Sequence, residues 1–234
     1  MNFGLRCSAI FHSYDRSFLG LLLFALFFWT GSLAAEGERP KIDCFGDSIT
    51  NRGYYKTLGG LVEADSLNAG VGGHNSKQGL RRIEKDVLAH QPDLVIVFFG
   101  TNDLRVDSER AHVPVAQYRK NLLTIIKKVR GVDADVILCT LPPINEEVYF
   151  TRHEKGSYDA AGGLQALIES YRQAAQEVAK EMKVPLVDLN QLLLKSPEWL
   201  SRDGVHPSPK GTRIIAEHVA KEVKALWAQT DDKQ

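Results

Sequence analysis

The run Leu94-Val95-Ile96-Val97-Phe98-Phe99 is the clearest structural signal in this chain of 234 residues. Six consecutive apolar side chains indicate a strand that is covered on both of its faces. We expect this strand over 93–99, and four other short runs are also expected to be strands: 41–45, 66–69, 135–140 and 185–189. Such strands are typical of parallel sheets with helices on both sides.

Helical patterns fill the intervals between these strands. We expect helices over 78–89, 115–129, 163–182 and 209–227. In the second of them, Tyr118, Leu122, Ile125 and Val129 recur at three- and four-residue spacing, which places them on one face of a helix. Strands that alternate with helices indicate parallel βαβ units, so the sequence predicts a three-layer α/β/α sandwich.

Polar residues and glycines collect where the predicted strands end. Gly46-Asp47-Ser48-Ile49 follows the first strand, Asn68-Ala69-Gly70 ends the second, and Gly100-Thr101-Asn102-Asp103 follows the third. A fourth group, Asp203-Gly204-Val205-His206-Pro207, precedes the last predicted helix. Because ligands bind outside the carboxyl ends of the strands in open parallel sheets, these four loops are expected to meet at one cleft.

Three residues of these loops have the chemistry of a nucleophilic triad. A serine hydroxyl is a poor nucleophile at neutral pH unless an imidazole takes its proton, and that imidazole must be held by an acceptor. Ser48 supplies the hydroxyl, His206 the imidazole, and Asp203, three residues before it, the acceptor. The alternative for Ser48 is a purely structural role as the cap of the following helix.

Taken together and in this order, the four groups resemble the sequence blocks of the GDSL/SGNH hydrolase family, and the likeness runs over 41–227. The resemblance implies a flavodoxin-like fold with five parallel strands in the order 2-1-3-4-5. It also implies ester hydrolysis through an acyl-serine intermediate on Ser48, with His206 as base and Asp203 as its partner. No cofactor and no metal are expected.

The resemblance further implies an oxyanion hole made of the Ser48 and Gly70 backbone amides and the Asn102 side chain. Gly70 lacks a Cβ, which would let its backbone approach the substrate, and Asn102 is a neutral donor. A plain turn glycine is the alternative for Gly70. We expect Asp47 to hold its turn through backbone hydrogen bonds, and Asp103 to cap the next helix.

Two cysteines of the predicted domain lie in apolar runs. Cys44 and Cys139 are therefore expected to be buried core side chains. In the strand order that the family implies they lie on strands one and four, which are not neighbours. Their Cα atoms should then be too far apart for a disulfide.

The N-terminus has the order of a secretory signal peptide. Arg6 and Arg16 precede an uncharged stretch over 17–35 that ends in Ser32-Leu33-Ala34-Ala35. A basic region, an apolar region and small residues in this order predict cleavage, here after Ala34. An uncleaved membrane anchor is the alternative, because the stretch approaches the roughly 20 residues that span a bilayer.

We therefore expect residues 1–34 to be a signal peptide and 35–234 to be one SGNH hydrolase-type domain, exported to the periplasm or the extracellular space. With cleavage, no stable membrane association is expected; without it, the protein would be membrane-anchored. The chain has 29 basic and 29 acidic residues, so no excess of positive charge points to a nucleic acid partner.

Two other functions compete with that of a serine esterase. A metallophosphoesterase would need several histidines and carboxylates around two metal ions. Only His206 has a suitable sequence setting. We expect the other histidines of the predicted domain to be structural or solvated: His74, His90, His112, His153 and His218. A catalytically silent carbohydrate-binding module on the same fold is disfavoured because every catalytic position is filled.

For the substrate, export and near-neutral charge favour a small-molecule or polysaccharide ester, most simply O-deacetylation of carbohydrate. Lysophospholipase or thioesterase activity is the alternative within the family. Tyr149, Phe150 and Tyr158, in the irregular segment 144–162, are expected to stack on sugar rings, although they could equally pack onto the domain. In that case Arg105, Tyr54 and Tyr55 are the next candidates for the substrate wall.

Overall fold

The computed structural model describes Met1 and residues 38–231. The predicted signal peptide and its cleavage point lie outside the described residues, Met1 excepted. One compact unit begins at Arg39. Within the described part of the chain, no helix combines the length and the apolar character that a membrane crossing requires.

The centre of this unit is a five-stranded parallel sheet with the order β2-β1-β3-β4-β5. The strands are β1 (Lys41–Gly46), β2 (Asp65–Gly70), β3 (Leu94–Phe98), β4 (Asp135–Cys139) and β5 (Leu186–Val187). The predicted fold class and strand order are confirmed. The last strand is shorter than predicted because the Asp188 side chain already accepts from Gln191 N and starts the next helix.

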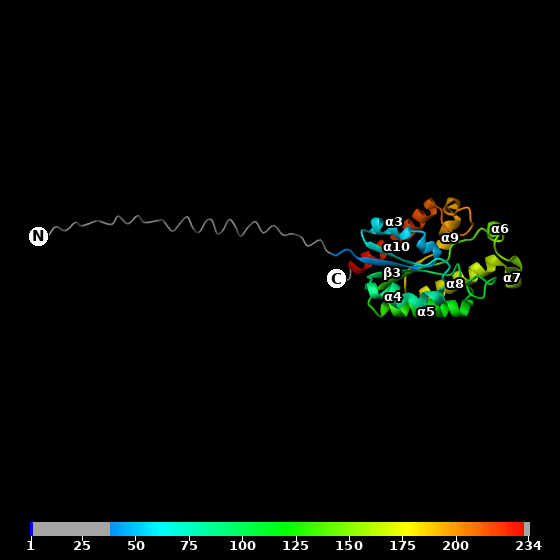
Figure 1. Ribbon diagram of the computed structural model, residues 1–234, viewed down its shortest axis with the longest axis horizontal. Coiled ribbons are helices and arrows are strands. Elements are labelled where there is room, and N and C mark those ends of the chain that lie inside the picture. The colour runs from blue at the N-terminus through cyan, green and yellow to red at the C-terminus, as the bar shows by residue number, and fades with distance from the viewer. Residues whose placement is uncertain (2–37, 232–234) are drawn as a thin grey trace. The chain divides into compact units, whose positions relative to one another are not determined.

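Helices cover both faces of the sheet (Figure 1). One face carries α3 (Tyr54–Val62), α9 (Leu189–Leu194) and α10 (Pro209–Asp231), and the other carries α4 (Ser76–Asp86), α5 (Val115–Arg130) and α8 (Leu164–Met182). The α4 helix begins before the predicted residue 78, because Asn75 and Gln78 form a reciprocal capping box at its start.

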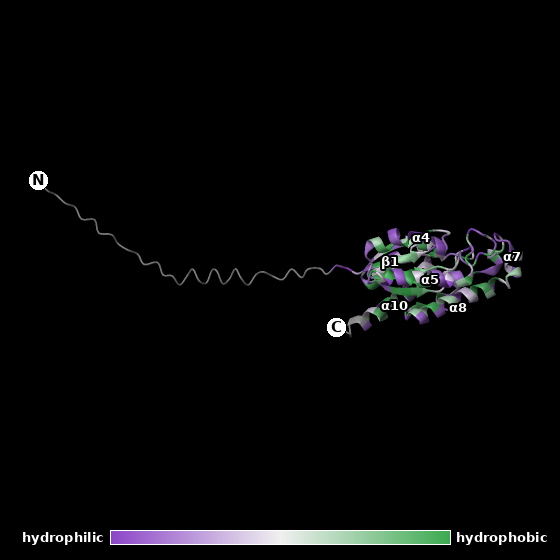
Figure 2. Cartoon of the chain, turned by 90° about the horizontal axis from the view of Figure 1, so that it is seen from below, coloured by the Kyte–Doolittle hydropathy of each residue, from purple (hydrophilic) through white to green (hydrophobic). Residues whose placement is uncertain are grey.

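Alternate side chains of the central strands divide the core between the two helical layers. Val95 and Val97 pack into the cluster under α4, α5 and α8, whereas Leu94 and Ile96 pack into the cluster under α3, α9 and α10. Figure 2 shows the resulting hydrophobic strands between helices of mixed hydropathy. Cys44 and Cys139 are buried and free, so the prediction that they form no disulfide is confirmed.

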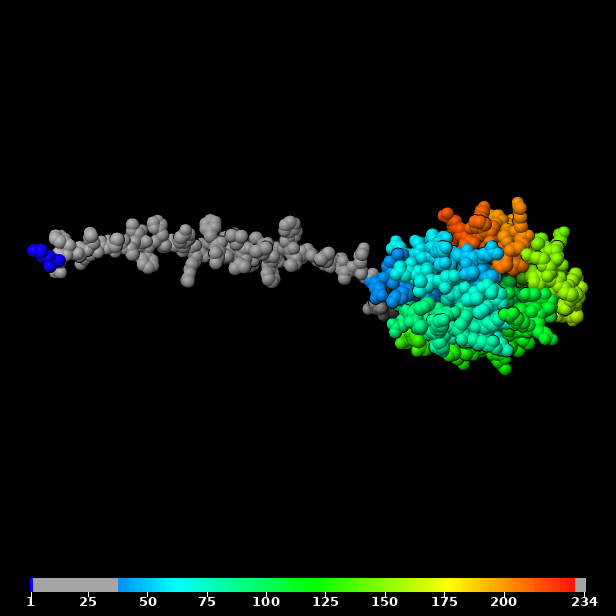
Figure 3. All heavy atoms as spheres, viewed as in Figure 1, coloured from blue at the N-terminus to red at the C-terminus, as the bar shows by residue number. Residues whose placement is uncertain are grey.

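The loops at the carboxyl ends of the strands are held by close packing. A Cβ on Gly46, at the end of β1, would lie 2.4 Å from Phe98 O of β3, so only glycine fits there. The short helix α2 (Ser48–Asn51) follows directly. The segment 144–162 contains two further short helices, α6 (Glu146–Tyr149) and α7 (Lys155–Ala160), and forms the yellow-green end of the domain in Figure 3.

Candidate active site

Ser48 is the first residue of α2, immediately after the β1 strand. The cap of this helix is Asp47, whose Oδ1 accepts from Ile49 N at 2.9 Å, so the Ser48 hydroxyl is not used as a cap. Its Oγ lies 2.9 Å from His206 Nε2, although the two residues are 158 positions apart in sequence. The fold thus brings the predicted nucleophile and base within hydrogen-bond distance.

The turn from Asp203 to His206 orients the imidazole. Asp203 Oδ2 lies 2.8 Å from His206 Nδ1, while Asp203 Oδ1 accepts from His206 N at 2.9 Å and Val205 N at 3.0 Å. The Ser201 hydroxyl donates to the same oxygen at 2.8 Å. Gly204 allows the turn, because its φ is +74° and a Cβ there would meet Val148.

The ionisation of Asp203 follows from these contacts. Partial burial acts to raise its pKa, but the backbone amides of His206 and Val205, the Ser201 hydroxyl and the His206 side chain outweigh it, so the pKa lies below its ordinary range. Arg52 adds a weaker ion pair, with its Nη2 3.9 Å from Asp203 Oδ2. The carboxylate is therefore ionised at neutral pH.

Asn102 lines the same cavity as Ser48 and His206. Its Nδ2 donates to His74 O at 3.1 Å and, at the longer distance of 3.4 Å, to Asp47 Oδ2. These contacts fix the amide group with its nitrogen toward the loop after β2. The predicted position of Asn102 near Ser48 is thereby found in the structure, whereas its role as an oxyanion donor stays a prediction.

Gly70 is not placed as an oxyanion donor. Its N–H donates to Asn68 Oδ1 at 2.9 Å, and it does not line the cavity that contains Ser48. A Cβ on Gly70 would lie 2.6 Å from Asn51 N and 2.8 Å from Asp47 O, so glycine is needed there for the packing of β2 against α2. The assignment of Gly70 to the oxyanion hole is corrected on this basis.

Gly73, three residues further on, lies at the cavity instead of Gly70. It lines the cavity together with Ser48 and Asn102, and its φ of +75° is one that glycine adopts at no steric cost. Among the described residues its N–H has no hydrogen-bond partner. The sequence hint was the run Gly72-Gly73 after Gly70, but spacing alone did not tell which glycine faces the site.

Asp103 lies under the site rather than at the start of the following helix. Its carboxylate accepts from Ser76 N at 3.0 and 3.1 Å and from the Ser76 hydroxyl, so it anchors the preceding helix α4 and the expectation that it caps the next helix is wrong. Burial raises the pKa of Asp103 to about 7, against the Ser76 hydrogen bonds that lower it. Burial likewise raises the pKa of Asp47 to about 7.

Replacing Asp103 by asparagine is expected to change how stability depends on pH. The folded protein keeps the Asp103 proton up to about pH 7, whereas the unfolded chain releases it near the ordinary value of 3.8. Its contribution to the free energy of unfolding is therefore full below that lower value and declines as pH rises through 7. Urea unfolding between about pH 4 and 8 should show a smaller decline in Asp103→Asn than in the wild type.

Asp135→Asn is the matched control, because Asp135 is exposed at the start of β4. A decline that is equal in Asp103→Asn and the wild type would show that Asp103 does not hold a proton in the folded state.

The cavity above Ser48 has a volume of about 360 Å³. Ten residues line it: Ser48, Gly73, Thr101, Asn102, Arg105, Tyr149, Arg152, His153, Val205 and His206. Of the three aromatic residues expected to contact sugar, Tyr149 lies in this wall, while Phe150 and Tyr158 do not. Tyr158 is fully buried, so its ring has no face free for stacking on a ligand.

Arg105, Arg152 and His153 also line this cavity. The sequence analysis named Arg105 only as a reserve, left Arg152 unassigned and expected His153 to be structural or solvated. His153 stacks on Tyr149 with ring centroids 3.9 Å apart, and its Nδ1 lies 2.9 Å from Asp107 Oδ2. Arg152 and His153 lie in the irregular segment 144–162, and Arg105 follows the Asn102 block, so the sequence marked both regions. The sequence of a polar loop, however, does not show which of its side chains turn toward the site.

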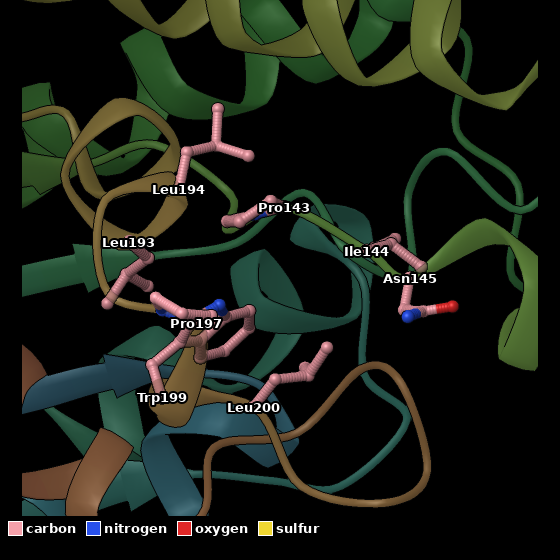
Figure 4. A pocket seen from close by; sticks show the side chains of 8 residues that line it. All are labelled: Pro143, Ile144, Asn145, Leu193, Leu194, Pro197, Trp199 and Leu200. Atoms are coloured by element: carbon pink, nitrogen blue, oxygen red, sulfur yellow. The ribbon is translucent and has the colours of Figure 1, made fainter.

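A second, mostly apolar cavity lies between the segment after β4 and the region around α9, and shares no lining residue with the first (Figure 4). Its volume is about 270 Å³, and Pro143, Leu193, Leu194, Trp199 and Leu200 are among its lining residues. No group of three or more histidine, cysteine or acidic side chains within the described ranges has an arrangement that could hold a metal ion.

Comparison with known proteins decides the family. The model of the GDSL-like lipase/acylhydrolase family matches residues 44–214. The chain belongs to this family. Proteins that the chain resembles include the uncharacterized lipoprotein YqeF of Bacillus subtilis, 30% identical over 233 residues that cover 85% of this chain and 95% of that protein. The isoamyl acetate-hydrolyzing esterase 1 homolog of Rattus norvegicus is 31% identical over 226 residues, covering 86% of each.

Solved structures agree with this family and its fold. The lipase/acylhydrolase from Enterococcus faecalis superposes with a TM-score of 0.65 at 29% identity, covering 80% of this chain and 96% of that one. The acetyl xylan esterase AlAXEase gives a TM-score of 0.63 at 27% identity, covering 76% and 97%. This GDSL-family chain is accordingly a carboxylic ester hydrolase.

Proposed function

We propose that the protein hydrolyses esters through an acyl-serine intermediate, with Ser48 as nucleophile, His206 as general base and Asp203 as the carboxylate that orients it. The observation that carries the proposal is the continuous pair of contacts from Ser48 Oγ to His206 Nε2, 2.9 Å, and from His206 Nδ1 to Asp203 Oδ2, 2.8 Å. The pair opens into a cavity, so an ester carbonyl can reach the hydroxyl.

In this mechanism His206 Nε2 takes the Ser48 proton as Oγ attacks the ester carbonyl. The tetrahedral oxyanion would accept from the Asn102 side chain and from the Gly73 and Ser48 amides. His206 then returns the proton to the departing alcohol oxygen, which leaves an acyl group on Ser48. Water, deprotonated by His206, attacks this acyl carbonyl; the proton goes to Ser48 Oγ, and the free acid is released.

For the substrate we propose a short acyl group on an alcohol of carbohydrate type. Eight of the ten residues that line the cavity above Ser48 have a polar side chain, which suits a small acyl group and a hydroxylated alcohol. The apolar cavity, where a long acyl chain would bind more favourably, shares no lining residue with it. The acetyl xylan esterase and isoamyl acetate esterase relatives support this choice over a lysophospholipid or a thioester.

We further propose that residues 1–34 direct export of the chain. Support comes from the order of basic, apolar and small residues in that segment and from the similarity to a bacterial lipoprotein.

Two experiments test the proposed function. A fluorophosphonate probe should label the wild type and not Ser48→Ala, which checks the nucleophile. A series of p-nitrophenyl esters from acetate to palmitate should show its highest kcat/KM at the short end. If kcat/KM were highest for acyl chains of about eight carbons or more, the preferred substrate would be a lipid ester and not a carbohydrate ester.

Asn102→Ala is expected to retain the fold and to lower kcat by roughly 10² to 10³, the usual loss for one oxyanion donor. The effect should fall on kcat rather than on KM, because the donor stabilises the tetrahedral state more than the ground-state carbonyl. Steady-state kinetics on p-nitrophenyl acetate measure both constants.

Asn68→Ala is the matched control, since Asn68 lies outside the cavity, where it donates to Asn51 Oδ1 and accepts from Gly70 N. Its kcat should stay well above that of Asn102→Ala. A change of KM alone in Asn102→Ala would make Asn102 a substrate-binding residue instead.

A further inference from the structure

The wall of the catalytic cavity has an uneven distribution of charge. Arg105, Arg152 and His153 line it beside His206, and none of its lining residues in the described structure is acidic. The chain as a whole has 29 basic and 29 acidic residues, so this bias is local. A cavity lined by one sign of charge attracts ligands of the opposite sign.

Arg105 is held in place by contacts on one edge of its guanidinium. Its Nε and Nη2 donate to Asp107 Oδ1 and Oδ2 at 3.3 and 3.0 Å. Asp107 is in turn fixed by Tyr158, whose hydroxyl donates at 2.7 Å, and by His153. The ion pair with Asp107 uses Nε and Nη2 of Arg105, and the Tyr149 hydroxyl also interacts with the guanidinium. Nη1 is the nitrogen that the ion pair leaves to a ligand.

The partial burial of Asp107 acts to raise its pKa, but its hydrogen bonds to Arg105, His153 and Tyr158 lower the pKa below the ordinary range. The carboxylate is 7% exposed and lies behind Arg105, outside both cavities that Arg105 lines. It therefore preorganises the arginine and does not itself face a substrate.

A neighbouring cavity of about 290 Å³ adjoins the catalytic one, and the two share Gly73 and Arg105 in their walls. Its other lining residues are Gly72, His74, Gln78, Ser108, Arg110 and Ala111. All of its polar side chains carry hydrogen-bond donors, two are arginines and none is acidic. Asn75 Nδ2 donates to Ala111 O at 2.8 Å and so fixes the backbone next to Arg110.

Arg110 is the second cation of this cavity. Its side chain is exposed, and no ion pair joins it to an acidic group of the described residues. Arg110, whose charge no acidic group of the described residues neutralises, lines the same cavity as Arg105, which Asp107 already orients. Two such arginines in one wall favour a planar anionic ligand there.

We propose that the cavity between Arg105 and Arg110 is a subsite for a carboxylate carried by the alcohol part of the ester, so that the preferred substrates are acylated acidic sugars or similar hydroxy acids. This inference rests on the proposed function for the placement of the ester at Ser48. Gly73, whose amide is one of the proposed oxyanion donors, lines both cavities and so joins the carboxylate subsite to the reacting centre.

The test uses matched aryl acetates: 3- and 4-acetoxybenzoate against 3- and 4-acetoxybenzamide. The members of each pair have nearly the same shape, but only the benzoate carries an anionic group. For the wild type, kcat/KM should be at least about tenfold higher for the carboxylate than for its carboxamide, which is the effect of one charge-assisted hydrogen bond. Each kcat/KM is first divided by the rate constant for hydrolysis of the same ester by hydroxide, which removes the difference in intrinsic reactivity. The same compounds titrated into Ser48→Ala by calorimetry report binding without turnover.

Arg110→Gln should reduce the preference to near unity, whereas Arg81→Gln should leave it unchanged. Arg81 is an exposed arginine of α4 that lines neither cavity, so it loses the same charge elsewhere. Equal kcat/KM for carboxylate and carboxamide, with equal affinities in Ser48→Ala, would overturn the subsite, as would a preference that Arg110→Gln retains.

Failure of the proposed function gives a different result. If the wild type hydrolysed none of the esters while Ser48→Ala still bound the carboxylate more tightly than the carboxamide, the subsite would stand and the serine mechanism would not.

Discussion

Ser48→Ala is expected to lower kcat for p-nitrophenyl acetate by on the order of 10⁶, and His206→Ala and the double variant should lose activity to a similar extent. The reason is that nucleophile and base act as a unit: without the imidazole at 2.9 Å the hydroxyl keeps its proton, and without the hydroxyl the imidazole has nothing to activate. Two independent contributions would instead give losses that multiply in the double variant.

Controls separate this loss from damage to the fold. Circular dichroism should be unchanged, and Ser170→Ala, at an exposed position of α8, should retain full activity. Addition of EDTA is expected to leave turnover unchanged, which distinguishes the serine mechanism from a metal-dependent one. Clear turnover by Ser48→Ala would end the proposal.

The second largest effect is expected from Asp203→Asn, a loss of roughly 10⁴ in kcat, as in a triad whose imidazole is held in the wrong tautomer. Asp203 Oδ1 accepts from three donors, the amides of Val205 and His206 and the hydroxyl of Ser201. An asparagine must keep its carbonyl oxygen there, which turns its NH₂ group toward His206 Nδ1. Nδ1 then becomes an acceptor, the proton moves to Nε2, and Ser48 loses its base.

Ser201→Ala is the matched comparison for Asp203→Asn. It removes one of the hydrogen bonds to Oδ1 but leaves the carboxylate and its contact with the imidazole, so its loss should be no more than about tenfold, the value of one modest hydrogen bond. The rate of fluorophosphonate labelling should follow the same order as kcat. If Asp203→Asn stayed within about tenfold of the wild type, Asp203 would be a turn-forming residue and not the partner of His206.

The strands, the helices and the candidate triad were predictable from local sequence. A continuous apolar run such as that around Leu94 has few structural solutions, and helical periodicity in 115–129 gives a buried face directly. Asp203 and His206 are neighbours in one turn, so their pairing needs only local geometry. Family resemblance then supplied the sheet order, which no single segment contains.

Only the tertiary structure decided which residues of the loops face the site. Gly70 and Gly73 are equally good candidates for the oxyanion donor when only the sequence is considered. In the structure, Gly70 is needed for the packing of β2 against α2, whereas Gly73 lines the cavity. The contact of Tyr158 with Asp107 joins residues 51 positions apart, and it turns a residue predicted to bind sugar into a buried support for Arg105.

The elements could be predicted and the walls of the site could not, because the two depend on interactions of different range along the chain. Hydrophobic period and turn chemistry act over a few residues and leave a pattern in the sequence, so they determined the elements and the Asp203–His206 turn. The direction of a side chain in an irregular loop is set by partners that folding brings from elsewhere, and burial or charge arises only once the layers are packed. The sequence by itself thus determined the fold and the reacting groups, and tertiary packing decided the walls of the site.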